Sequence, residues 1–227
     1  MSKTWMTGAA LGLGGLLLTG CAGGTSGPGV AVAVGDQTIS AAHVDRTAAH
    51  MCEALEEDFR AQSTVVPMSF IRQGVVQLLS LRAQARQIAE QYGVEPGPTY
   101  EREVAERSRS VAGLPENVRE SYVEVMTADA LATAVVEQVG RAKLEEEGFA
   151  EPTAEQVSQA GNDVFATWPD QHGIEIDPQY GLEFSDGALV PTDTSLSVAV
   201  SDLAKLGQAS EPDPSYAASL PASQRCG

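Results

Sequence analysis

Apolar residues recur at helical spacing through most of the chain, and this pattern predicts a mainly α protein. One helix is predicted over residues 41–60 and a second over residues 69–92, each with its apolar residues on one face. Ser40 is placed to cap the first helix, and Gly93 is a natural stop for the second. The apolar faces are Val44, Ala48, Cys52, Leu55 and Phe59 in the first helix and Ile71, Val75, Leu78, Leu79, Ala85 and Ala89 in the second.

More helices are predicted in the middle of the chain. Thr99 is placed to cap a short charged helix over residues 99–110, and residues 115–147 read as one long helix or as two joined near Thr127. Thr153 and Gln156 then match a capping box, which marks the start of another helix. Because a proline disfavours helical geometry in the residue before it, this last long helix is expected to end near residue 168.

Short strand signals flank the helices. In "VAVAVGDQTIS", which starts at Val30, valines alternate with alanines and Gly35-Asp36 offers a turn, so this segment is a small hairpin or a bent strand. "GIEIDPQYG" predicts a short strand with a turn after the last long helix, whereas "LSVAVSDLAKLG" fits no single type of element. Residues 30–207 therefore form one mainly helical domain, and the Pro/Ser-rich tail, residues 208–227, is expected to lack regular structure.

The start of the chain has the pattern of an export signal. Lys3 precedes an uncharged stretch over residues 4–20, which contains several glycines and threonines. A membrane-spanning helix needs about twenty apolar residues, so a cleaved signal is favoured over a retained N-terminal anchor.

The end of this signal, Leu18-Thr19-Gly20-Cys21, resembles the lipobox of bacterial lipoproteins. The resemblance implies that residues 1–20 are a signal peptide and that Cys21 becomes the lipidated N-terminus, with diacylglycerol on its sulfur and an acyl chain such as palmitate on its amine. It also implies a lipid-anchored protein on the extracytoplasmic face of the cell membrane, with residues 21–29 as a flexible tether. Several acyl chains make a stable anchor, because each buried methylene contributes about 0.8 kcal/mol.

The net charge narrows the range of partners. It is −17 for the whole chain and −18 without residues 1–20, which carry Lys3 and no acidic residue. Nucleic acid and anionic lipid both demand patches of Lys and Arg, so neither nucleic acid nor a lipid surface beyond the acyl anchor is an expected partner.

Two cysteines remain after lipidation, Cys52 and Cys226. In an oxidising compartment an even remainder favours a disulfide between them. The alternatives are a buried thiol at Cys52 with a free one at Cys226, or an intermolecular bond through Cys226.

No pattern in the sequence indicates catalysis, a cofactor or a metal. His43 and His50 share one face of the predicted first helix, but zinc sites need three or four ligands, and neither a tight Cys/His cluster nor an HExxH motif is present. The sequence also lacks the GxSxG turn of serine hydrolases, the P-loop and the dinucleotide fingerprint.

Several segments together resemble the N-terminal domain of the SurA/PrsA-like foldase chaperones. "VAVAVGDQTISAAHV" is similar to that domain's opening valine-rich strand, glycine turn and Ser- or Thr-capped helix. "GVEPGPTYEREV" is similar to the join between its second and third helices, and "PTAEQVSQAGNDV" to the helix that carries the chain onward. The resemblance covers roughly residues 30–168 and implies a helical SurA N-terminal-like domain.

The resemblance implies a chaperone without isomerase activity. In this family the last helix leads into a parvulin-type prolyl isomerase domain of about ninety residues, whereas only 57 residues follow Asp170 here, and the His-Ile-Leu opening of that domain is missing. The expected function is therefore to bind unfolded exported polypeptides without catalysis. The alternative is a ligand-binding or structural lipoprotein on the same helical scaffold.

A cluster of apolar residues beside Pro67 is the candidate site for such clients. Apolar side chains on an unpaired helix face can form a groove for unfolded segments, and methionine adapts to varied partners. The other interpretation is that the cluster fills the core of the domain itself. The candidate residues are Val65, Val66, Met68 and Phe70.

Overall fold

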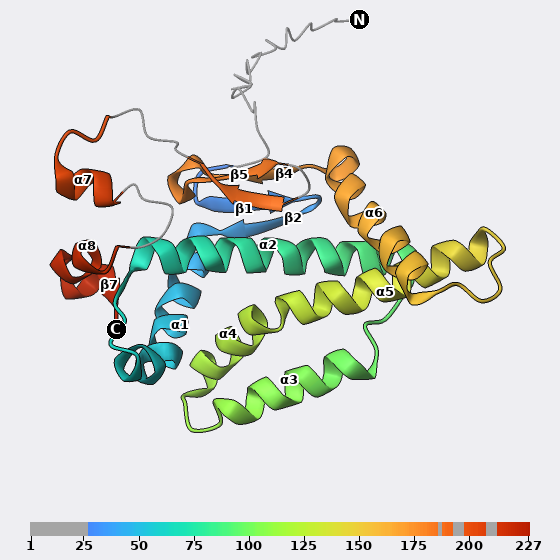
Figure 1. The fold of residues 1–227 in the computed structure, drawn as a ribbon, viewed down its shortest axis with the longest axis horizontal. Coiled ribbons are helices and arrows are strands. Elements are labelled where there is room, and N and C mark those ends of the chain that lie inside the picture. Colours follow the sequence, from blue (N-terminus) through green and yellow to red (C-terminus); the bar gives the residue numbers. More distant parts are fainter. Residues whose placement is uncertain (1–26, 186–187, 193–197, 208–212) are drawn as a thin grey trace, which may run out of the picture.

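The fold is mainly helical, as the apolar pattern predicts (Figure 1). The structure, a computed structural model, describes residues 27–185, 188–192, 198–207 and 213–227. Its long helices are α1 (Ala41–Ala61), α2 (Met68–Tyr92), α3 (Pro98–Ser110), α4 (Glu116–Met126), α5 (Ala128–Glu146) and α6 (Ala154–His172). Two short ones, α7 (Asp202–Gly207) and α8 (Pro214–Ser219), follow near the C-terminus.

In the described part of the chain, the strands form three small antiparallel sheets. β1 (Val30–Val34) lies between β2 (Gln37–Ser40) and β4 (Ile174–Ile176), so the two ends of the helical region are joined in one sheet. β1 and β2 form the hairpin alternative of the predicted segment, with Gly35 at φ 55° in the turn. The other sheets are the β5–β6 hairpin (Leu182–Ser185 and Ala188–Pro191), which the sequence pattern did not reveal, and the pair of β3 (Val66–Pro67) with β7 (Arg225–Cys226).

Helix α2 is the central element of the fold. It runs across the molecule between the sheet that contains β1 and the helices α4 and α5 (Figure 1), and it packs on α1, α5 and β1. Full burial of a Val or Ile side chain contributes about 1.5–3 kcal/mol, so this valine-rich interior is the main source of stability. The largest fully buried apolar side chains are Ile88, Val32, Val34, Val44, Val75, Val76, Val118, Val125, Val135 and Val139.

Local capping signals place several of the helix ends. The Ser40 hydroxyl accepts a hydrogen bond from the backbone N–H of His43 at 3.2 Å, and Gly93 ends α2 in the left-handed conformation at φ 63°. Thr153 and Gln156 form both bonds of the predicted capping box. The segment 115–147 is two helices, and they meet at the fully buried Thr127.

Two predicted helix ends are wrong. Helix α3 starts at Pro98 with Gly97 at the cap position, not at Thr99, because a proline suits the first turn, where its missing N–H has no partner to lose. Helix α6 continues through Pro169 to His172 instead of ending near Trp168. Trp168 is buried and packs with α2, donating from Nε1 to Gln91 at 3.2 Å, and this packing outweighs the local preference against helix.

The prediction that the tail lacks regular structure is also wrong for its described part, residues 213–227. Asp213 caps α8, a 3₁₀ turn spans Ala222–Gln224, and β7 pairs with β3. The segment that fitted no single type contains α7. Among the described residues, no helix is long and apolar enough to cross a membrane.

Candidate functional site

The predicted lipidation site lies outside the described residues. The structure describes the chain from residue 27 onward, so the signal peptide, Cys21 and most of the tether fall before it. The tether reaches the domain at Gly27, whose carbonyl accepts from Val30 N–H at the start of β1.

The predicted cysteine pair comes together in the structure. Cys52 on α1 and Cys226 on β7 are separated by 174 positions in sequence, yet their Cα atoms are 5.6 Å apart and their sulfurs are joined. A Cα separation of this size is what a disulfide requires. The bond fastens the C-terminal segment to the first helix.

The predicted client groove is wrong for two of its four residues. Val66 is 8% and Met68 is 7% exposed, and both belong to the hydrophobic core. β7 pairs with β3, with Cys226 opposite Val66, and both residues belong to the same core cluster as Met68, which composition alone did not reveal. Val65 is half-buried, and Phe70, in the first turn of α2, keeps 43% of its surface exposed.

Exposed apolar side chains lie at several separate places on the described surface. Besides Phe70 they include Phe149, which is 45% exposed in the turn between α5 and α6. The others, Val198, Val200 and Leu203, are at or just before α7. Single exposed apolar residues are ordinary, so Phe70 is distinguished only by its place at the start of α2, two residues after the buried Met68.

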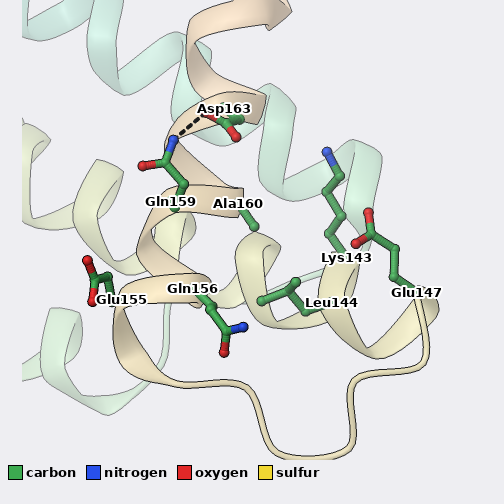
Figure 2. A pocket seen from close by; sticks show the side chains of 8 residues that line it. All are labelled: Lys143, Leu144, Glu147, Glu155, Gln156, Gln159, Ala160 and Asp163. Carbon is green, nitrogen blue, oxygen red and sulfur yellow. Dashed lines mark hydrogen bonds between the residues drawn. The ribbon is translucent and has the colours of Figure 1, made fainter.

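A groove between α5 and α6 was not predicted (Figure 2). It has a volume of about 470 Å³, and Figure 2 shows that its side chains come from facing turns of the two helices. Its polar groups include one amine and three carboxylates, and the Gln159 amide donates to Asp163 at 2.7 Å. The lining residues are Lys143, Leu144, Glu147, Glu155, Gln156, Gln159, Ala160 and Asp163. Helix spacing alone gave no signal for it, because the groove depends on how two helices pack.

The histidines have protein partners. His50 on α1 is hydrogen-bonded through Nδ1 to the Ser121 hydroxyl at 2.8 Å and through Nε2 to the Asn117 amide at 3.0 Å. His43 Nε2 lies 3.5 Å from a carboxylate oxygen of Glu124, so both residues join α1 to α4. Within the described part of the chain, no group of three or more His, Cys, Asp and Glu side chains is placed to hold a metal ion.

His172 has a packing role. Its ring stacks on Trp168, with ring centroids 4.2 Å apart and an interplanar angle of 6°. Its Nδ1 is also hydrogen-bonded to the Trp168 carbonyl at 3.0 Å, which completes the last turn of α6.

Arg82 ties three parts of the helical body together. Its Nη1 donates to the Tyr100 hydroxyl at 3.1 Å and to the Thr127 hydroxyl at 3.4 Å, linking α2 to α3 and to the junction of α4 and α5. Its Nε is buried and has no hydrogen-bond partner among the described residues. A buried N–H without a hydrogen-bond partner lowers the stability of the fold. The two hydrogen bonds of Nη1 and the packing of the Arg82 methylene groups must therefore offset this cost.

Tyr180 joins the segment after β4 to α2. Its carbonyl accepts from the Gln73 amide at 2.9 Å, and the residue is 6% exposed. Burial raises the pKa of its phenol above the ordinary value, and the negative charges of Asp45 and Asp177 raise it further. The phenol is therefore held neutral, which fits a structural role.

Comparisons of the chain with known proteins found no relative. No family model matches the chain, and it has no significant match among curated proteins or among solved structures.

Proposed function

We propose that this protein is a lipid-anchored, extracytoplasmic chaperone-like protein that binds unfolded exported polypeptides without catalysis. The anchor is Cys21, and the helical domain of residues 30–207 binds the client close to the membrane surface.

The observation that carries the proposal is how the fold opens. β1, the turn at Gly35 and the Ser40-capped α1 follow one another in the order that the resemblance to SurA/PrsA-like chaperones implies. α6 begins with the Thr153 capping box, at the point where that family's domain leads onward.

The surface around Phe70 is the most suitable place for a client. The phenylalanine is 43% exposed in the first turn of α2, directly after the apolar residues of β3, and Val65 is half-buried beside them. An aromatic side chain offers a large apolar contact area at low conformational cost, which suits binding to apolar segments of varied sequence. The strongly negative chain would in addition repel acidic surfaces and favour neutral or basic clients.

The second candidate function is binding of a small polar ligand, and the groove between α5 and α6 favours it. Its volume of about 470 Å³ lies within the range of small-molecule sites. Three carboxylates against one amine would select cationic or neutral polar compounds. In this alternative the same scaffold is a ligand-binding lipoprotein that does not hold clients.

A binding assay distinguishes the two functions. The Cys21→Ser protein, which cannot be lipidated, is titrated into a fluorescently labelled precursor polypeptide kept unfolded in low denaturant. The chaperone function predicts saturable binding of the unfolded precursor and no binding of the same polypeptide after folding. Absence of binding to the unfolded form would overturn it and leave the ligand-binding alternative.

The proposed absence of catalysis is tested by a separate prolyl isomerisation assay. The proposal predicts no acceleration of prolyl isomerisation in a peptide substrate by the purified protein. A rate enhancement that a single substitution abolishes would contradict this part of the proposal.

A further inference from the structure

The C-terminal segment, residues 213–227, closes over one end of the helical core. Its last strand β7 runs antiparallel to β3, with Val66 opposite Cys226 and Pro67 opposite Arg225, and α8 also lies against β3. Figure 1 shows this segment at the end of the molecule where α1 leads into α2.

The C-terminal segment packs on the apolar core. Cys226 is 1% exposed and belongs to the same core cluster as Val66 and Met68. Gly227 follows at φ 103°, and a Cβ built there would overlap the carbonyl oxygen of Thr64 and approach the Cβ of Phe59 to 3.2 Å. The segment therefore lies against Phe59, Thr64 and Val66, at the end of α1 and in β3.

Apart from the disulfide, the segment is held by α8 and β7 against β3, by β7 against α1, and by its 3₁₀ turn at Ala222–Gln224 against α2. Only Ala217 and Cys226 are buried among residues 213–227. The ladder with β3 pairs two residues on each side, and Pro67 has no N–H to donate to it. The Arg225 guanidinium donates to Ala218 within the segment itself. Burial and pairing on this scale are weak compared with the entropy of ordering fifteen residues.

We propose that residues 213–227 are a cover whose release is controlled by the Cys52–Cys226 bond. A dithiol reductant supplies the reaction: its thiolate attacks the Cys52 sulfur, since Cys52 is half-buried and Cys226 is buried, and the Cys226 thiolate leaves. The second thiol of the reductant then displaces Cys52 from the mixed disulfide. In sum the two protein sulfurs gain two electrons and two protons, and the dithiol becomes a disulfide.

Release of the cover leaves the edge of β3 unpaired beside an apolar surface. The occupant it fits is an extended peptide with apolar side chains, because β7 occupies this position as an extended strand whose Cys226 side chain is buried in the core cluster. Binding would rest on such apolar side-chain contacts and not on the short ladder with β3. The identity of this ligand rests on the proposed function, in which clients are unfolded polypeptides, whereas the release of the cover does not.

Hydrogen exchange of the full mature protein, with and without dithiothreitol, tests the release. The proposal predicts that reduction speeds exchange at least about tenfold, or 1.4 kcal/mol, in residues 59–68 and 213–227. Exchange in α6, on the other side of the fold, stays unchanged. Unchanged protection of the segment would overturn the proposal, and so would a rise throughout the chain, which would make the bond a support of the whole fold.

A synthetic, fluorescently labelled peptide of alternating valine and threonine tests the occupant. The proposal predicts at least about tenfold tighter binding by the reduced protein than by the oxidised protein. The Cys52→Ser/Cys226→Ser variant should match the reduced protein without any reductant. Equal affinity of the peptide for the oxidised and the reduced protein would overturn the assignment of this ligand, even if hydrogen exchange shows that the cover is released. The binding assay with unfolded precursor uses the oxidised protein. Its outcome is therefore independent of the hydrogen-exchange result and of the peptide-binding result, and failure of the proposed function can be told apart from failure of this inference.

Discussion

Gly140 of α5 and Gly161 of α6 bring the backbones of their helices into contact. A Cβ built on Gly140 would lie 2.9 Å from the Gly161 nitrogen and would overlap the carbonyl oxygen of Val157. A Cβ on Gly161 would overlap the carbonyl oxygen of Val136 in the same way. The close approach of α5 and α6, which also shapes the groove between them, therefore depends on the absence of two side chains.

Alanine at either glycine should destabilise the protein. Gly140→Ala and Gly161→Ala force the two backbones apart, and overpacking of this kind costs about 1–3 kcal/mol in the free energy of unfolding. Gly74→Ala is the matched control, since this helical glycine of α2 has no heavy atom within 4 Å of its built Cβ. The control should stabilise by about 0.5–1 kcal/mol through helix propensity alone. Urea denaturation followed by circular dichroism measures all three, and equal effects at positions 74 and 140 would refute the contact.

The buried phenol of Tyr180 should make the protein sensitive to alkali. Its pKa is raised in the folded state, so the protonated form is favoured by folding. The contribution of this phenol to the free energy of unfolding is fully present below about pH 10, the ordinary pKa of tyrosine. It is lost as the pH rises towards the higher pKa of Tyr180 in the folded protein. Tyr180→Phe should remove this slope while keeping most of the packing. The check is the unfolding free energy of both proteins against pH; parallel curves above pH 10 would contradict the prediction.

Lipidation of Cys21 is a prediction about the mature N-terminus. Mass spectrometry of protein purified from membranes should find acyl chains on Cys21 and no residues 1–20. Cys21→Ser should leave the protein unprocessed or release it from the membrane fraction. An intact Met1 together with a free Cys21 thiol would count against the lipoprotein interpretation.

Features set by neighbouring residues in sequence could be predicted. Ser40, Gly93 and the Thr153 capping box act within one helical turn, so their roles follow from local spacing alone. The mainly α fold follows in the same way from the apolar faces of the helices. The junction at Thr127 was one of two alternatives, because the surrounding residues suit helix on both sides.

Features set by distant contacts, apart from the pairing of Cys52 with Cys226, could not be predicted from the sequence. Trp168 carries α6 past Pro169 through its packing on α2, and no local rule contains that contact. The tail looked unstructured by composition, but Cys226 fixes it to a residue 174 positions away. The cysteine count predicted the pairing, yet it did not predict that β7 would pair with β3 and place Cys226 in the core opposite Val66. The contact between Gly140 and Gly161 is invisible until α5 and α6 are packed together.

Two phenylalanines allow a sharp test of the client surface. Phe70 and Phe149 are 43% and 45% exposed, but Phe70 lies in the first turn of α2, directly after β3, whereas Phe149 lies in the turn between α5 and α6. Substitution by serine removes a phenyl ring at each of the two positions, and the two rings are similarly exposed. Only the change at Phe70 should affect binding of a client.

The most direct measurement is light scattering of a chemically denatured exported protein, diluted into buffer with oxidised Cys21→Ser protein present. We expect aggregation to be suppressed in proportion to the protein added. We also expect Phe70→Ser to weaken the effect by at least about fivefold, or 1 kcal/mol, while Phe149→Ser leaves it unchanged. Absence of suppression by the Cys21→Ser protein, or equal losses from the two serine variants, would contradict binding of clients at Phe70.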